Sequence, residues 1–156
     1  MSTFTAKALA AFWLLGGAAA ALAKPPMTPL QRGRYLIQTA GCNDCHTPGY
    51  GPNNGQVSEK LWLTGDALGW SGPWGTTYAT NLRLLLAGMS EQQWLRHARR
   101  MEPRPPMPWF NVRAMSDRDL KAIYAYTRSL GAAGAPAPAY VPPGGTVTGP
   151  VVRFPQ

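Results

Sequence analysis

The sequence has very little cysteine. Its 156 residues include only two, Cys42 and Cys45. This excludes a small domain held together by several disulfides and a zinc site built from four cysteines. Long uninterrupted helices are also not expected, because 17 glycines and 16 prolines make up about a fifth of the chain, against roughly an eighth on average. A long coiled coil or an all-helical bundle is therefore disfavoured, while 45% hydrophobic residues argue against wholesale disorder.

Long hydrophobic runs are equally scarce, with one exception near the N-terminus. Residues 8–20 are apolar, follow Lys7 and precede the small-x-small pattern of residues 21–23, which predicts a cleaved secretory signal peptide over residues 1–23. The alternative is a retained membrane anchor, but the Ala-rich run is shorter than the ~20 residues that a span needs. We expect a periplasmic mature chain with no transmembrane segment. Free thiols become oxidised there, so both cysteines should be covalently occupied.

Three segments begin with helix-capping residues and continue with apolar residues at helical spacing. The capping residues are Thr28 with Gln31, Ser90 with Gln93, and Ser116. In the first two pairs a Gln stands three residues after the cap, which is the pattern of a capping box. We expect helices over about residues 29–40, from Ser90 to just before Pro103, and from Ser116 to Gly131.

Two other segments lack helical periodicity. Residues 47–88 are dense in Gly, Pro and aromatics with little alternation, and a compact domain rarely carries such a stretch unless something organises it. A large apolar ligand would do so. Residues 131–156 form a tail rich in Ala, Gly and Pro, for which we expect extended or polyproline-like backbone. The tail could be a disordered tether, or it could dock through residues such as Tyr140 and Phe154.

The motif that carries chemistry is C-x-x-C-H, formed by Cys42, Cys45 and His46. It is the attachment signature of c-type haem, in which two thioethers hold the porphyrin and the imidazole binds the iron. A thioredoxin-like redox pair would need a βαβ context, and none is visible. A zinc site would need further ligands, yet only His97 is left. The motif, the export signal and the absence of a spare cysteine together favour one covalently attached haem c with its iron.

The chain resembles the class I c-type cytochromes. The resemblance is carried by residues 33–36, 40–47, 106–109 and 115–126, and it spans about residues 28–130. It is closest to monohaem domains similar to cytochrome subunits of bacterial periplasmic dehydrogenases. The implied fold is all-α, with three or more helices and long loops wrapped around one covalent haem, in a cytochrome c domain over residues 24–130.

In this family the first and last helices cross near a right angle. The resemblance therefore implies that Gly33, which lacks a side chain, lets Tyr124 or Ile123 approach closely.

The second axial ligand of the iron should be Met107. It lies in a proline-rich segment with little conformational entropy to lose, and the resemblance puts the axial Met of the family at this position. A Met thioether would favour Fe(II) and raise the potential. Met115, His97 and an open site remain as alternatives.

The sequence also suggests residues that line the haem pocket. The candidates are Trp70, Trp74, Tyr78, Asn81 and Trp109. Indole and phenol groups can donate hydrogen bonds to the haem propionates while their rings cover the porphyrin, although any of these residues could equally be plain core. We further expect His46 to donate its second ring nitrogen to a backbone carbonyl, which would fix its orientation.

Acidic residues are few, with 7 Asp and Glu against 15 Lys and Arg and a formal charge of +8. A basic rim around an exposed haem edge would attract an acidic redox partner, such as a dehydrogenase, an oxidase or another cytochrome. Nucleic acid is not an expected partner, because no binding module is recognisable.

The function we expect is one-electron transfer by a periplasmic monohaem carrier rather than an enzyme. The alternative is a small haem peroxidase or a gas-binding protein with an open or His97-lined distal site.

Overall fold

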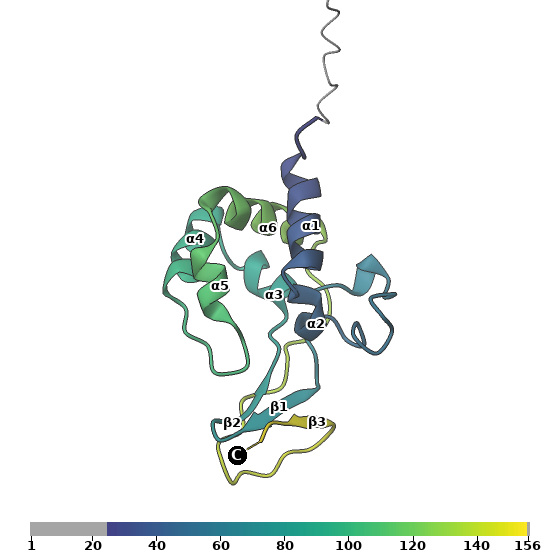
Figure 1. Cartoon of the computed structure of the whole chain (residues 1–156), viewed down its shortest axis with the longest axis vertical. Coiled ribbons are helices and arrows are strands. Elements are labelled where there is room, and N and C mark those ends of the chain that lie inside the picture. Colours follow the sequence, from purple (N-terminus) through teal and green to yellow (C-terminus); the bar gives the residue numbers. More distant parts are fainter. Residues whose placement is uncertain (1–24, 156) are drawn as a thin grey trace, which may run out of the picture.

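The computed structural model describes residues 25–155, so the predicted signal peptide at residues 1–23 lies outside it. Within residues 25–155 the chain forms six α-helices, one 3-10 helix and three short strands (Figure 1). In chain order these are α1 (Pro29–Thr39), α2 (Cys42–His46), η1 (Glu59–Leu61), β1 (Gly69–Gly72), β2 (Gly75–Tyr78), α3 (Leu82–Ala87), α4 (Glu91–Arg100), α5 (Trp109–Ala114), α6 (Asp117–Ser129) and β3 (Val151–Arg153). None of the helices in this part of the chain is long and apolar enough to span a bilayer.

The three predicted helices are present as α1, α4 and α6, and their first turns are capped as expected. The Thr28 and Ser90 side chains each accept a hydrogen bond from the third residue of the helix, whose Gln side chain bonds back to the cap. Ser116 caps α6 by accepting from the amide of Asp119. Each cap satisfies amide donors that the first helical turn leaves free, which is why these boundaries could be predicted locally.

Helices α1 and α6 cross at Gly33, with closer contact than any side chain would permit. A Cβ atom on Gly33 would lie 2.1 Å from the carbonyl oxygen of Ala122 and 2.6 Å from the Cβ of Tyr126. The expectation that Tyr124 or Ile123 approaches Gly33 was therefore wrong. Residues 122 and 126 are one turn apart on one helix face, whereas residue 124 lies about 200° further round the helix. Tyr124 instead donates its hydroxyl to the carbonyl of Met89.

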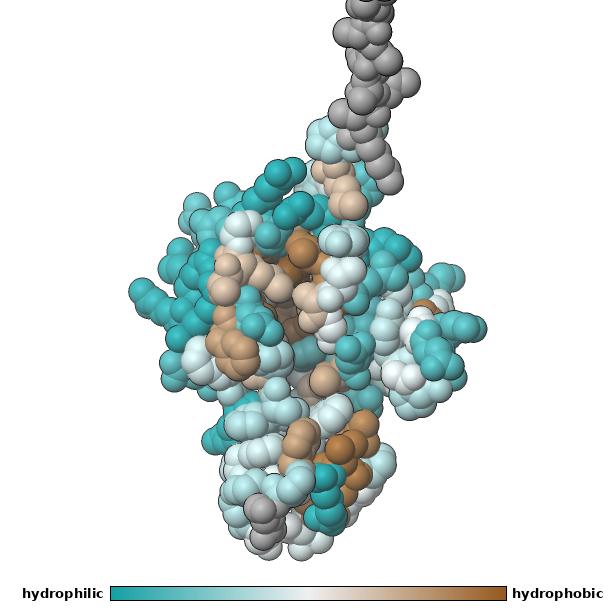
Figure 2. All heavy atoms as spheres, viewed as in Figure 1, coloured by the Kyte–Doolittle hydropathy of each residue, from teal (hydrophilic) through white to brown (hydrophobic). Residues whose placement is uncertain are grey.

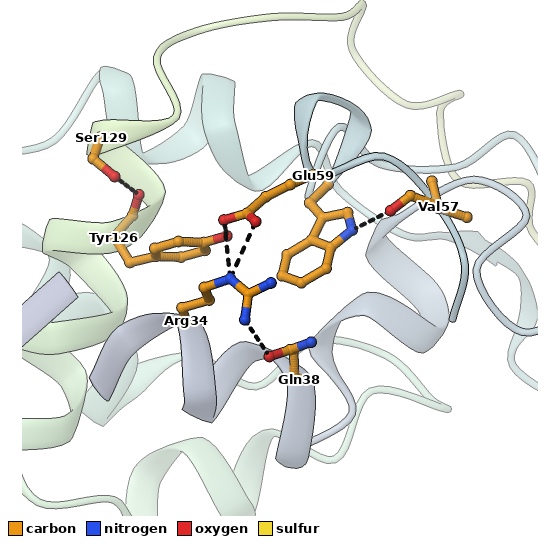
Figure 3. Close-up of polar contacts among 7 residues, drawn as sticks. Arg34, Gln38, Val57, Glu59, Tyr126 and Ser129 are labelled. Carbon is orange, nitrogen blue, oxygen red and sulfur yellow. Dashed lines mark hydrogen bonds and ion pairs between the residues drawn. The ribbon is translucent and has the colours of Figure 1, made fainter. Parts of the chain in front are cut away.

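The carboxylate of Glu59 connects the crossing of α1 and α6 to η1 (Figure 3). Glu59, in η1, accepts a hydrogen bond from the Tyr126 hydroxyl of α6 and one of 3.1 Å from Arg34 Nε of α1. Burial tends to raise the pKa of Glu59, but the hydrogen bonds from Tyr126 and Arg34 outweigh it and hold that pKa below its usual value. The Arg34 guanidinium also covers the ring of Trp62, 5.2 Å from its centroid.

Beneath the crossing lies the main hydrophobic core. Its fully buried members come from both helices and from the segments between them, and they include Ile37, Leu63, Leu86 and Leu120. Burial of such side chains supplies most of the driving force that holds the helices together. Arg83 is also buried, and its guanidinium donates to the carbonyl of Lys60 in η1 and to those of Leu130 and Gly131, which directly follow α6.

A small sheet completes the fold at one end of the molecule, where Figure 1 also shows the C-terminus. Strands β1 and β2 form an antiparallel hairpin, and β3 pairs with β1 in parallel, from Gly69↔Val151 to Ser71↔Arg153. The sequence had indicated no strand in either segment. The strands have only three or four residues, too few for a period to show, and β3 meets a partner some eighty positions earlier in the chain.

The tail therefore docks, which settles the choice that the sequence left open. Besides the β3 pairing, Phe154 packs its ring against those of Trp70 and Trp74, with centroids 6.1 and 5.4 Å apart. The Tyr140 hydroxyl donates to the carbonyl of Trp74 at 2.8 Å. Residues 131–155 thus form part of the folded domain rather than a tether.

Candidate functional site

The C-x-x-C-H motif lies on α2, a helix of little more than one turn that directly follows α1. Cys42 and Cys45 are three residues apart and so share one face of this turn, and His46 is its last residue. The two thiols are not joined in a disulfide. The arrangement presents two thiols and an imidazole on a single short element, which is the donor set that covalent haem attachment requires.

His46 is held in a defined orientation. Its Nδ1 lies 2.7 Å from the carbonyl oxygen of Thr80, and only 8% of the residue is exposed. A carbonyl can only accept, so Nδ1 carries the proton and Nε2 keeps its lone pair. Burial lowers the pKa of His46, which keeps the ring neutral as a metal ligand must be. The expected hydrogen bond to a backbone carbonyl is confirmed, and its acceptor is Thr80.

The cysteines lie in surroundings that disfavour the thiolate. Burial raises the pKa of Cys42 to about 11, and burial with the nearby carboxylates of Asp44 and Asp66 raises the pKa of Cys45. A reactive redox cysteine has its pKa lowered instead, often at the N-terminus of a helix in a βαβ unit. The two thiols therefore lack the lowered pKa that is typical of a dithiol exchange centre.

Two polar residues of the motif region have structural roles that the sequence analysis missed. Thr47 donates its hydroxyl to Asn43 Oδ1 at 2.7 Å and accepts a hydrogen bond of 2.9 Å from the amide of Leu63. Both residues are almost fully buried. Asn43 and Thr47 thus connect α2 to the loop that follows it. The only sign of this role in the sequence is that one polar residue stands inside the motif and another directly after it.

The candidate iron ligand Met107 lies on a loop that we call the Met107 arm, residues 101–108 between α4 and α5. Met107 is half-buried, and its carbonyl accepts from the amide of Trp109 at 2.9 Å. Further along the arm, the carbonyl of Pro105 accepts from the Thr77 hydroxyl at 2.8 Å. The arm is thus connected to β2 two residues before Met107.

The alternative ligands are engaged elsewhere. Met115 and Met89 pack against the hydrophobic core. His97 lies on α4 with its ring 6.2 Å from that of Trp94 and inclined to it by 34°. These contacts give each residue a packing role, whereas Met107 lies on a loop outside that core.

The predicted pocket residues do not share one role. Asn81 is 2% exposed, and its amide is fully used within the chain, since it accepts from Leu84 N and donates to the carbonyls of Ala133 and Ala135. It therefore caps α3 and holds the tail, and has no donor left for a propionate. Trp74 donates its indole N–H to the carbonyl of Trp70 at 3.3 Å.

The other three aromatic candidates, Trp70, Tyr78 and Trp109, have surroundings of different kinds. Among the described residues, the buried indole N–H of Trp70 has no hydrogen-bond partner. An unpaired buried donor is costly, so Trp70 fits a site for an acceptor such as a propionate oxygen. Tyr78 ends β2 opposite Gly69, and Trp109 opens α5 with the Arg113 guanidinium 4.4 Å above its ring.

The surface also has a shape suited to a flat apolar group. Figure 2 shows hydrophobic side chains gathered around a hollow between α5 and the α1–α2 region. Helix α2 carries the motif, and α5 directly follows the Met107 arm, so the two sets of candidate ligands come from opposite sides of this hollow.

Comparison with known proteins identifies the family. The model of the Cytochrome c family matches residues 30–131, from α1 to the end of α6. The chain belongs to the cytochrome c family. No curated protein and no solved structure matches it.

The family assignment confirms the cofactor and the general activity. The cytochrome binds covalently attached haem c with its iron, and electron transfer is the typical activity of its family. The mostly helical architecture with short strands agrees with the class I cytochrome c fold. The matched span ends at residue 131, so the docked tail lies beyond it.

Proposed function

We propose that this cytochrome is an exported monohaem carrier, in which Cys42 and Cys45 form the thioethers and His46 and Met107 bind the iron. The observation that carries the proposal is the buried His46, which directly follows the two thiols and is oriented by the Thr80 carbonyl. Met107 lies on the arm, two residues before α5, whereas Met89 and Met115 pack against the hydrophobic core.

The chemistry is the transfer of one electron between two proteins. Haem iron supplies it by alternating between Fe(III) and Fe(II), so a reduced donor protein loses one electron and an oxidised acceptor protein gains it. The chain contributes a fixed imidazole, a soft thioether and an apolar enclosure, which together set the potential. The unpaired Trp70 indole is the donor that we assign to a propionate.

The proposed docking face surrounds the Met107 arm. Exposed arginines on α4 and on the arm itself lie close together in sequence, namely Arg96, Arg100 and Arg104, while the neighbouring Arg99 pairs with Asp117. Phe110, on the adjoining α5, is 60% exposed. An apolar centre with basic neighbours suits an acidic redox protein, which would associate at a rate that falls with salt. A periplasmic dehydrogenase or oxidase has the required chemistry, in the compartment that the predicted signal peptide indicates.

Optical spectra of the mature haem-loaded protein test the axial ligands. We expect the wild type to be six-coordinate and low-spin, with the weak far-red band of a ferric His/Met haem and no carbon monoxide binding to the ferrous form. Met107→Ala should abolish the band and permit carbon monoxide binding. Met115→Leu is the matched control and should keep the band, since Met115 packs on the core.

Two results would contradict these assignments. If the wild-type iron is already high-spin and binds carbon monoxide freely, His/Met electron transfer is wrong. If Met115→Leu rather than Met107→Ala abolishes the band, the ligand assignment is wrong.

A further inference from the structure

The tail and the Met107 arm meet on the same strand. Strand β2 bonds to the tail through Thr76, whose N–H donates to the carbonyl of Val141 at 2.8 Å and whose carbonyl accepts from the Val141 N–H at 3.0 Å. The next residue, Thr77, donates its hydroxyl to Pro105 on the arm. Two segments that are distant in sequence are therefore attached to adjacent residues of one strand.

The approach of the tail to β2 is unusually close. A Cβ atom on Gly75, which has φ 94°, would lie 2.4 Å from the Val141 carbonyl oxygen and 3.0 Å from the Tyr140 ring. Only glycine adopts this conformation without strain and leaves that space. Tyr140 is fixed in addition by the hydrogen bond of its hydroxyl to Trp74.

Tyr140 in turn contacts the arm directly. The guanidinium carbon of Arg104 lies 3.8 Å from the centroid of the Tyr140 ring, in a stacked cation–π arrangement. Arg104 stands three residues before Met107 and next to Pro105. The arm is thus held at two neighbouring residues, by Thr77 of the hairpin and by Tyr140 of the tail.

We propose that Tyr140, acting through Arg104, is a positioning residue that holds Met107 against the iron. The tail would then be a brace that keeps the Met ligand bound, and its loss would let the thioether dissociate more often. This inference rests on the proposed Met107 ligation. It concerns a segment outside the family match and gives that segment a role in the electron-transfer site.

Competition by imidazole measures how firmly Met107 is held, because imidazole binds ferric iron only when the thioether has left. Loss of an exposed cation–π contact corresponds to an affinity change of about two- to fivefold. We therefore expect Tyr140→Leu and Arg104→Gln each to tighten imidazole binding by about two- to fivefold. The double variant should add little to either single change, because both remove the same contact.

Matched variants separate positioning from general stability. Tyr140→Phe loses the hydrogen bond to Trp74 but keeps the ring that stacks on Arg104, so imidazole affinity should change less than in Tyr140→Leu. Arg100→Gln removes one exposed positive charge from the same region and controls for electrostatics. Hydrogen exchange at the Trp109 amide, which donates to Met107, should speed up in Tyr140→Leu and Arg104→Gln alone.

The outcomes distinguish this inference from the proposed function. Suppose that Met107→Ala abolishes the far-red band, but imidazole affinity and Trp109 exchange are unchanged in Tyr140→Leu and Arg104→Gln. The positioning role of Tyr140 is then wrong, while Met107 remains the ligand. If the wild type has no far-red band, the Met107 ligation and the positioning role of Tyr140 are both wrong. Arg104→Gln changes an exposed side chain, so the test does not depend on Tyr140→Leu folding well.

Discussion

Two regions of this cytochrome are held together in different ways. In the helical region, α1, α2, η1 and α6, contacts come from capped helices, a glycine crossing and the Glu59 bonds (Figure 3). In the sheet region, β1, β2 and the tail, backbone pairing joins segments some eighty residues apart. The family match covers the helical region and the hairpin but not the tail. The comparison shows that the C-x-x-C-H motif depends on local structure, whereas the position of the Met107 arm depends on contacts with distant segments, namely Thr77 of β2 and Tyr140 of the tail.

The largest effect should come from Gly33 in the helical region. Gly33→Ala forces a methyl group against the Ala122 carbonyl, a backbone atom that cannot rotate away, so we expect a loss of about 3 kcal/mol in the free energy of unfolding. Denaturant unfolding of the haem-loaded protein measures it. Gly51→Ala is the control, because nothing lies within 4 Å of a Cβ there. Equal stability of the two variants would contradict the close crossing.

A smaller effect, confined to the sheet region, is expected for Phe154. Phe154→Ala removes a half-buried ring that packs on Trp70 and Trp74, which should cost about 1.5–2 kcal/mol. Hydrogen exchange should show that amides in β1, β2 and β3 lose protection, while amides in α1 and α6 keep theirs. Val152→Ala, at a more exposed position of β3, serves as control. Uniform loss of protection in both regions would show that they unfold as one unit.

The smallest effect is a pH dependence at Glu59. Its pKa is lower in the folded chain than in the unfolded one, so its contribution to stability is present above about pH 4.3 and disappears as pH falls through the folded pKa. Glu59→Gln should lessen the fall in melting temperature between about pH 5 and pH 3. Glu91→Gln, in a 3.9 Å surface pair with Lys121, is the matched control. Identical acid profiles for wild type and Glu59→Gln would remove the role given to this carboxylate.

Several features could be predicted because their causes lie within a few residues. The caps at Thr28, Ser90 and Ser116 act over three positions, and α1, α4 and α6 begin where these caps place them. The hydrogen bond from His46 was expected from the needs of a metal ligand, but its acceptor, Thr80, lies 34 residues away and had no local signal.

Other features could not be predicted, because composition alone does not show which distant residues contact one another. Asn81 resembled a pocket residue, yet tertiary structure uses its amide to hold the carbonyls of Ala133 and Ala135. The Gly33 crossing was foreseen with the wrong partners, since one residue of helix register turns a side chain by about 100°.

The sequence by itself determined the covalent chemistry of this protein, because two thiols and an imidazole stand within five residues at the spacing of the C-x-x-C-H motif. It also determined the three main helices, through their caps and apolar spacing. Only the tertiary structure decided which carbonyl orients His46, which indole N–H within residues 25–155 is buried without a partner, and where the tail lies. These depend on contacts between distant segments, and such contacts form only when burial of apolar surface brings those segments together.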